Sequence, residues 1–179
     1  EAIGMSQKKN INYLDKSIKK CVVYLEPRDF KCTWVGNKAV YRTRMAMEDG
    51  GELLILAPGV NCFGEDSEND RIIRKYGYCG REKVLNLFQK ELDLQENMGV
   101  AAHLIHGSSD GRFMITYAVQ KITTQEIEAV GYRGTEYENA IQHYDVRTLK
   151  DGWNVMPDGE EIYFISNPAL GLWISKERF

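Results

Sequence analysis

The sequence predicts an α/β fold, and two observations carry this prediction. The run ELLILA at 52–57 is apolar at almost every position, which is typical of a strand that is covered by helices on both faces. A strand, a helix and this second strand follow one another within about forty residues, and that order defines a βαβ unit with a right-handed crossover. We therefore expect a Rossmann-like three-layer domain around a mostly parallel sheet of about four or five strands.

The remaining elements are expected to alternate along the chain. The β-branched run before Pro27 predicts a strand at 19–25, and GNKAVYRTRMAMEDGG predicts a helix at 38–48 with Asn37 as its N-cap and Gly50-Gly51 as its stop. Beyond ELLILA, the patterns predict helices at 67–75, 81–91, 93–105, 124–130 and 135–144, and strands at 112–118 and 161–166. Residues 150–160 have the composition of surface turns.

Composition limits the classes of protein that fit. The 179 residues are expected to form one domain spanning 1–179, and the net charge of -3 offers nucleic acid no broad basic surface. The apolar runs are too short to cross a bilayer and no secretory signal opens the chain, so we expect a cytoplasmic protein. The chain begins at Glu1 rather than at methionine, which indicates processing or a piece of a longer protein. The four cysteines lack zinc-ligand spacing and are expected to be free thiols.

Ligands of open α/β sheets bind near the carboxyl ends of the strands. By this rule the helix after the first strand carries the strongest candidates, because Lys38, Tyr41 and Arg42 share one helix face. Arginine suits bidentate recognition of a carboxylate. The alternative interpretation is that Lys38 and Arg42 belong to a solvated helix face.

The loop after ELLILA offers Asn61, Glu65 and Asp66. The adjacent carboxylates could bind a metal or act as a general base. The alternative is that Asp66 or Ser67 caps the next helix and that these acids complement its macrodipole. Phosphate-binding loops, an EF-hand and a nucleophile elbow are excluded, because none of their spacings occurs in the chain.

The stretch AAHLIHGSSDGR at 101–112 holds two of the three histidines, His103 and His106. Their spacing of three places both on one helix face, and Gly107 is a candidate C′ residue. Because this helix end precedes a strand, we expect it at the amino edge of the sheet, away from the ligand edge, and interpret both histidines as helix-end residues. The alternative is a hydrolase that uses His106 with Ser108 or Ser109. His143 is interpreted as structural or exposed.

Three phrases of the sequence, GNKAVYRTRMAMEDGGELLILAPGVNCFGED, HLIHGSSDGRF and ISNPALGLW, together resemble the C-terminal domain of the nickel-dependent lactate racemase family. The resemblance covers nearly the whole chain and is strongest to a group of uncharacterised homologues of that racemase. It implies the C-terminal half of a two-domain racemase or epimerase of α-hydroxy acids, with the active site in the cleft between the domains.

The resemblance also implies what this chain lacks. In that family the N-terminal domain tethers a nickel-pincer nucleotide through a lysine and supplies a nickel-binding histidine and two acid/base histidines. We therefore expect no cofactor, metal or catalytic residue in this chain, which would be inactive alone. Its expected partners are that N-terminal domain and a small hydroxy acid, without nucleic acid or membrane.

The family's C-terminal domain presents a tyrosine, a glutamine and, three residues further, a lysine to the substrate. Here Tyr41 matches the tyrosine, whereas Arg42 replaces the glutamine and Met45 replaces the lysine. Lys38, one turn earlier, could still reach a substrate carboxylate, and Arg42 with Arg44 would suit a larger sugar acid. Four further residues could line the cleft: Asn61, Glu65, His106 and Ser108. The alternative function is a non-catalytic α/β binding or regulatory module.

Overall fold

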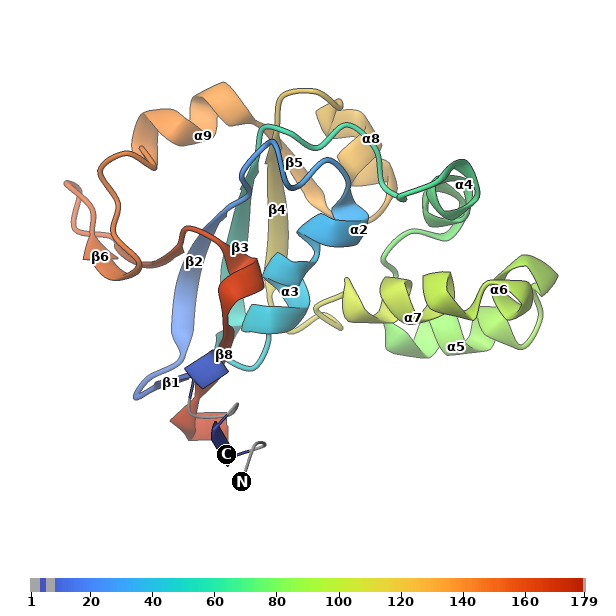
Figure 1. Ribbon diagram of the computed structural model, residues 1–179, viewed down its shortest axis with the longest axis horizontal. Helices are drawn as coiled ribbons and strands as arrows, with labels where there is room; N and C mark the ends of the chain where they lie inside the picture. Colours follow the sequence, from blue (N-terminus) through green and yellow to red (C-terminus); the bar gives the residue numbers. More distant parts are fainter. Residues whose placement is uncertain (1–3, 6–8, 179) are drawn as a thin grey trace.

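A six-stranded sheet forms the centre of the protein, in the order β5-β4-β3-β2-β7-β6 (Figure 1). The computed structural model describes residues 4–5 and 9–178, so the expectation drawn from Glu1 lies outside the described residues. Strands β2 to β5 and β7 are parallel, and β6 pairs antiparallel with β7. The six strands are β2 (Ile18–Tyr24), β3 (Met47–Ala57), β4 (Met114–Val119), β5 (Arg133–Glu136), β6 (Gly152–Val155) and β7 (Glu161–Ile165).

The α/β class and the mostly parallel sheet are confirmed, but the count of four or five strands is wrong. The two additional strands, β5 and β6, lie at the two edges of the sheet and read RGTE and GWNV. An edge strand is paired on one side only and needs no continuous apolar run. RGTE is polar, and GWNV has only two apolar residues, Trp153 and Val155, both exposed, so neither segment has the continuous apolar run by which the central strands are found.

A second, two-stranded parallel sheet joins the two ends of the chain. It pairs β1 (Ile11–Leu14) with β8 (Leu172–Ser175), and an isolated bridge between Met45 and Ile174 connects it to the body of the protein. Figure 1 shows this pair at the bottom of the molecule, beside both termini.

Helices cover the two faces of the central sheet unequally. Seven helices share one hydrophobic core with one of these faces, α5 and α6 by packing on α7: α2 (Thr33–Gly36), α3 (Lys38–Thr43), α4 (Ser67–Tyr76), α5 (Arg81–Phe88), α6 (Leu92–Glu96), α7 (Met98–His106) and α8 (Thr124–Ala129). The other face is covered by α9 (Tyr137–His143). Two 3-10 helices, η1 (Pro168–Leu170) and η2 (Lys176–Arg178), flank β8. None of the helices in the described part of the chain is long and apolar enough to cross a membrane.

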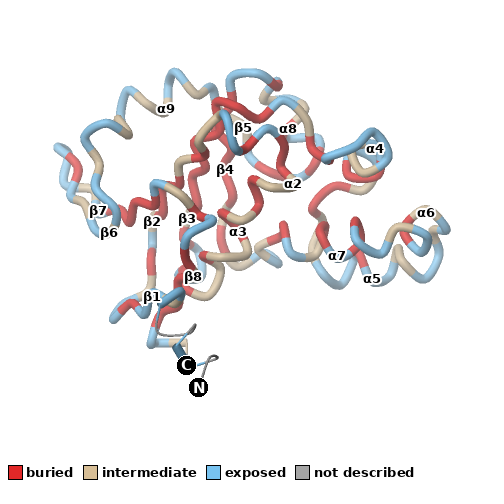
Figure 2. Tube along the Cα trace, viewed as in Figure 1, coloured by how far each residue is buried: buried red, intermediate tan, exposed pale blue. Residues whose placement is uncertain are grey.

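Alternate side chains of β3 belong to two separate cores. Leu53 and Ile55 pack beneath the larger helical layer, whereas Leu54 and Leu56 pack beneath α9. All four are buried, and Figure 2 shows the inner strands buried along most of their length. ELLILA is therefore covered on both faces, as its apolar pattern predicts.

The helix expected at 38–48 is shorter than predicted. It ends at Thr43, and β3 already begins at Met47, so Gly50 and Gly51 lie inside a strand instead of stopping a helix. Gly51 is needed there because an added Cβ would lie 2.7 Å from the carbonyl oxygen of Lys19 on β2. Gly51 therefore marks a close approach of two strand backbones, whereas Gly50 adopts a φ of 81°, which favours glycine.

Residues 81–106 form three helices, α5, α6 and α7, where two were expected at 81–91 and 93–105. α5 ends at Phe88, and Asn97 separates α6 from α7 with φ -122° and ψ 60°. Its side-chain amide donates to the carbonyl of Asp93. The strand β5 likewise occupies the start of the helix expected at 135–144. Figure 1 shows that α5, α6 and α7 extend away from the central sheet.

Candidate functional site

The last turns of α3 and α7 meet at the amino edge of the sheet. Each helix precedes the amino end of a strand, and these two strands, β3 and β4, are parallel neighbours. The rings of Tyr41 on α3 and His106 on α7 lie edge to face, with centroids 6.4 Å apart and an interplanar angle of 89°. Tyr41 is partly buried and His106 is exposed.

This contact corrects the expected separation of His106 from the residues of α3. His106 does lie in the last turn of α7, as predicted. However, α3 starts beyond the carboxyl end of β2 and runs back to the amino end of β3, so its last residues reach the same edge as His106. In a parallel sheet, the helix that follows a strand starts at the carboxyl edge and ends at the amino edge. The rule that ligands bind at the carboxyl edge therefore applies to the first residues of such a helix and not to its last residues.

Two cations of α3 are tied to neighbouring segments. Arg42 donates from Nη1 to the carbonyl oxygen of Gly171 at 3.1 Å, which connects α3 to the segment before β8. Arg44 donates from Nη2 to Oδ2 of Asp110 at 3.0 Å. Lys38 is partly buried and forms no ion pair within the described residues.

Residues 107–111 (GSSDG) connect α7 to β4, and Asp110 organises the contacts of this GSSDG junction. Besides binding Arg44, its carboxylate accepts a hydrogen bond from the backbone N–H of Arg81 at 2.8 Å, at the start of α5. The backbone N–H of Asp110 donates to the hydroxyl of Ser108 at 3.0 Å, and Asp110 itself has a φ of 53°. A left-handed backbone conformation is uncommon for residues other than glycine, and the hydrogen bonds of Asp110 hold its backbone in this conformation. The loop thus links the ends of α3 and α7 to the start of α5.

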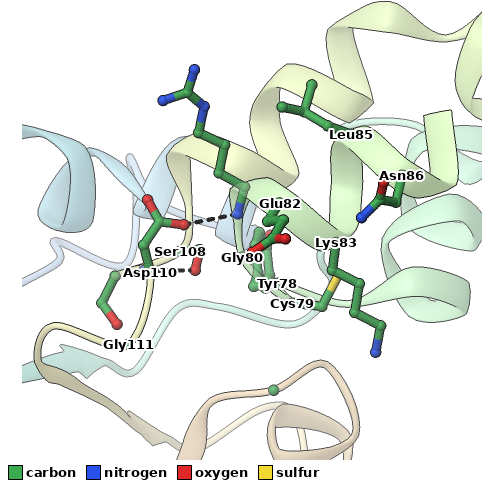
Figure 3. A pocket seen from close by; sticks show the side chains of 13 residues that line it. Tyr78, Cys79, Gly80, Glu82, Lys83, Leu85, Asn86, Ser108, Asp110 and Gly111 are labelled. Atoms are coloured by element: carbon green, nitrogen blue, oxygen red, sulfur yellow. Dashed lines mark hydrogen bonds between the residues drawn. The ribbon is translucent and has the colours of Figure 1, made fainter. Parts of the chain in front are cut away.

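A depression of about 1080 Å³ opens beside this junction. Figure 3 shows Asp110 and Gly111 on one side of it and Lys83 of α5 on the other, with Ser108 and Gly80 between them. Ser108 therefore lines this depression at the amino edge of the sheet, whereas Tyr41 and His106 are not among its lining residues.

The hydrolase interpretation lacks its central contact. Within the residues that the structure describes, His106 forms no hydrogen bond to Ser108 or Ser109, and the Ser108 hydroxyl accepts from the backbone. A serine nucleophile needs a base within hydrogen-bond reach.

A buried polar cluster beneath this surface holds α3 and α7 in position. Asn37, expected as an N-cap, makes no capping hydrogen bond; its Oδ1 accepts from Tyr117 at 2.7 Å and from Tyr132 at 3.1 Å. His103 stacks on Trp34 with ring centroids 4.3 Å apart, and its Nε2 lies 2.9 Å from the Tyr78 hydroxyl. The cluster joins α2, α3 and α7 to the strands below.

Burial sets the protonation of this cluster. It lowers the pKa of His103 to about 4, with a smaller contribution from His106, so His103 is neutral at pH 7. Burial raises the pKa values of the Tyr78, Tyr117 and Tyr132 phenols, which remain hydrogen-bond donors. The cluster is therefore uncharged.

Sequence reasoning missed the role of this cluster. Gly107 has a φ of -77°, so it is not a left-handed C′ residue. An added Cβ would lie 2.5 Å from Cε1 of Tyr78 and 2.6 Å from Nδ2 of Asn37. Glycine is required at position 107 because Tyr78 and Asn37, which are distant in the sequence, pack against it. The residues next to Gly107 in the sequence give no sign of this requirement.

Asn61 and Glu65 lie apart from the other candidates. Both follow the carboxyl end of β3, whereas His106 and Ser108 precede the amino end of the parallel neighbour β4. Asp66 caps α4 by accepting from the backbone N–H groups of Glu68 and Asn69, as one of the two interpretations predicts. No group of three or more potential metal ligands occurs within the described residues.

Comparisons with known proteins show the fold and a distant structural relationship. No protein-family model and no curated protein sequence matches the chain. A crystal structure of a Thermotoga maritima protein solved by a structural genomics consortium matches 98% of this chain with a TM-score of 0.72 and 22% identity. The lactate racemase apoprotein of Thermoanaerobacterium thermosaccharolyticum matches 95% of it with a TM-score of 0.62 and 8% identity.

The chain spans about two fifths of the length of these solved structures, 41% and 38% respectively. It is therefore similar to one part of each longer protein. At these identities the similarity shows a shared α/β fold, and the resemblance to lactate racemase is structural and distant.

Proposed function

We propose that this chain is the C-terminal, cleft-forming domain of a racemase or epimerase of α-hydroxy acids, and that it is inactive alone. One observation carries the proposal. In a fold shared with a lactate racemase apoprotein, Tyr41, one of the predicted substrate residues of α3, lies beside His106 of α7.

The charges of this surface suit a small carboxylate. Lys38 and Arg42 lie four positions apart, about one turn of α3, and Tyr41 lies between them in the sequence. A guanidinium and an ammonium group within one turn provide the positive charge that a carboxylate requires. The Tyr41 phenol and the His106 imidazole would hydrogen-bond the hydroxyl groups of the same acid.

Arg44 is less available, since it is paired with Asp110. We therefore assign carboxylate binding to Lys38 and Arg42, and we assign Arg44 to holding the GSSDG junction in place. Asn61 and Glu65, at the opposite end of β3, are left out of this proposed site.

The proposed cofactor is a nickel-pincer nucleotide bound by the N-terminal domain of the complete protein. When bound, it would take up and return the hydride of the substrate's α-carbon. The residues of this chain would orient the acid by its carboxylate and hydroxyl groups and would exclude water from that side of the cleft.

The proposal is tested with the complete gene product, made in cells that also carry the cofactor-making enzymes. Bound nickel is measured, and a panel of lactate and sugar acids is screened for inversion at the α-carbon. We expect bound nickel, inversion of at least one acid, and a large loss of activity in Tyr41→Phe and His106→Gln. Lys150→Gln, on a surface loop, is the matched control. Absence of nickel together with absence of inversion would overturn the proposal.

The alternative function, a non-catalytic binding or regulatory module, predicts a different result. Such a protein would bind a carboxylic acid, detected by calorimetry, without inverting it and without retaining nickel.

A further inference from the structure

Two of the four cysteines, Cys32 and Cys62, face each other at the carboxyl edge of the sheet. They come from different loops, since Cys32 lies between β2 and α2 and Cys62 lies between β3 and α4. The structure pairs them in an isolated parallel bridge. This site is at the opposite end of β3 from the Tyr41 and His106 surface.

The register of this pair is set by the backbone around it. Three backbone-to-backbone hydrogen bonds join the two segments: Asn61 N–H to Lys31 O at 3.0 Å, Thr33 N–H to Cys62 O at 3.2 Å, and Trp34 N–H to Phe63 O at 2.8 Å. Paired strands lie about 4.8 Å apart, and opposite residues in parallel register direct their side chains to the same side. Disulfides span Cα separations of about 4.4–6.8 Å, and the usual spacing of paired strands lies within that range.

We propose that Cys32 and Cys62 are a dithiol modification site, which a low-molecular-weight disulfide such as oxidised glutathione converts into an intramolecular disulfide. The two thiols differ in access, because Cys62 is partly exposed whereas Cys32 is only 5% exposed. Cys62 is thus the thiol that reacts with the oxidised glutathione, and Cys32 is the thiol that then reacts with the mixed disulfide on Cys62.

The reaction proceeds by two exchanges. The Cys62 thiolate attacks one sulfur of the oxidised glutathione, forms a mixed disulfide and releases one glutathione, which takes up the proton. The Cys32 thiolate then attacks the Cys62 sulfur and releases the second glutathione. The protein loses two protons and two electrons, and the glutathione disulfide gains them.

Burial raises the pKa values of both thiols, and the contact between them raises that of Cys62 further. The thiolate is the reactive form, so mildly alkaline conditions favour the reaction. The resulting disulfide would fasten the loop that leads into α2 and α3 to the loop after β3. Because it closes a loop of about thirty residues, it would restrict the unfolded chain and stabilise the fold.

The test uses the reduced, purified chain incubated with oxidised glutathione at mildly alkaline pH. Free thiols are counted in denaturant, and the remaining thiols are blocked before peptide mass spectrometry. We expect the count to fall from four thiols to two, a Cys32–Cys62 linked peptide, and a midpoint of thermal unfolding higher by roughly 5 °C or more. The expected rise disappears when a reductant is added.

Two variants complete the design. Cys79→Ser removes the other partly exposed cysteine, and it is expected to form the same linked peptide. Cys62→Ser is expected to keep its three thiols. A lasting glutathione adduct on Cys62 with Cys32 still free, or a linked peptide that contains Cys79, would overturn the proposal in the wild-type chain, whether or not either variant folds.

Discussion

His103 is a buried histidine whose neutral form is built into the packing between α2 and α7. Its ring stacks on Trp34 and its Nε2 meets the hydroxyl of Tyr78. A protonated imidazole would be a buried charge without a carboxylate partner among these contacts. The protonation of this single ring is therefore linked to the free energy of unfolding.

We expect the protein to lose stability as the pH falls from 6.5 to 4. Burial lowers the pKa of His103 to about 4 in the folded state, so between these values the unfolded chain binds the proton more readily. The stabilisation is complete above pH 6.5 and amounts to roughly 3 kcal/mol, lost progressively towards pH 4. Urea unfolding measured across this range checks the slope. His103→Gln, which cannot be protonated, should show a clearly flatter dependence; an equal slope in both proteins would contradict the assignment.

Gly107 is predicted to tolerate no side chain. Its backbone angles suit any residue, but the Cβ of Gly107→Ala would overlap the ring of Tyr78 and the amide of Asn37. Overpacking of this kind costs about 1–3 kcal/mol, measured as a lower midpoint of urea unfolding. Gly99→Ala is the control, because Gly99 also lies in α7 and its Cβ would meet nothing within 4 Å. The control should gain up to about 1 kcal/mol from helix propensity.

At the scale of single elements, α4 has the clearest start. Asp66 accepts hydrogen bonds from the backbone N–H groups of Glu68 and Asn69 at 3.0 Å and 2.8 Å. Asp66→Ala removes this cap and is expected to destabilise the protein by about 1 kcal/mol. Ser67→Ala should change the free energy of unfolding by less than about 0.5 kcal/mol. Chemical denaturation of both variants separates them, and a larger effect at Ser67 would move the cap by one residue.

The elements that sequence reasoning located best are those whose signals are local. The predicted range 67–75 differs from α4 by one residue, because a capping aspartate precedes an amphipathic run. β3 was recognised from its buried half, but its first half, MEDGG, resembles the end of a helix. The strands β5 and β6 were missed, since edge strands carry little apolar pattern. The first half of β3 and the strands β5 and β6 form because they pair with strands that are distant in the sequence.

The candidate site was predictable in its parts and not in its assembly. Lys38, Tyr41 and Arg42 could be singled out from their spacing on one helix face, and His106 could be placed in a last helical turn, where it was interpreted as a helix-end residue. Their contact depends on the parallel order of β3 and β4, which brings two helix ends to one edge of the sheet. A motif along one segment does not encode that order.

At the scale of the whole molecule, the chain closes on itself through the β1 and β8 pair. Trp173 and Ile174 of β8 are 8% and 5% exposed, and Met45 at the end of α3 bridges to Ile174. The last strand therefore supports both the first strand and the turn that leads from α3 into β3. β8, near the C-terminal end of the sequence, therefore stabilises the helix that carries the candidate site.

Ending the chain after Gly171 is expected to destabilise the whole fold and not only its C-terminus. The truncation exposes the surface that Trp173 and Ile174 cover, and burial of two such side chains contributes roughly 3–6 kcal/mol. Ending the chain after Ser175 keeps β8 and is the matched control. Thermal unfolding should show a large loss only in the shorter protein, and hydrogen exchange should be faster at Ile11–Leu14 and at residues 45–47. The idea would be contradicted if residues 45–47 exchanged no faster in the protein that ends after Gly171. That result would mean that β8 covers β1 alone and that α3 is held by the central sheet.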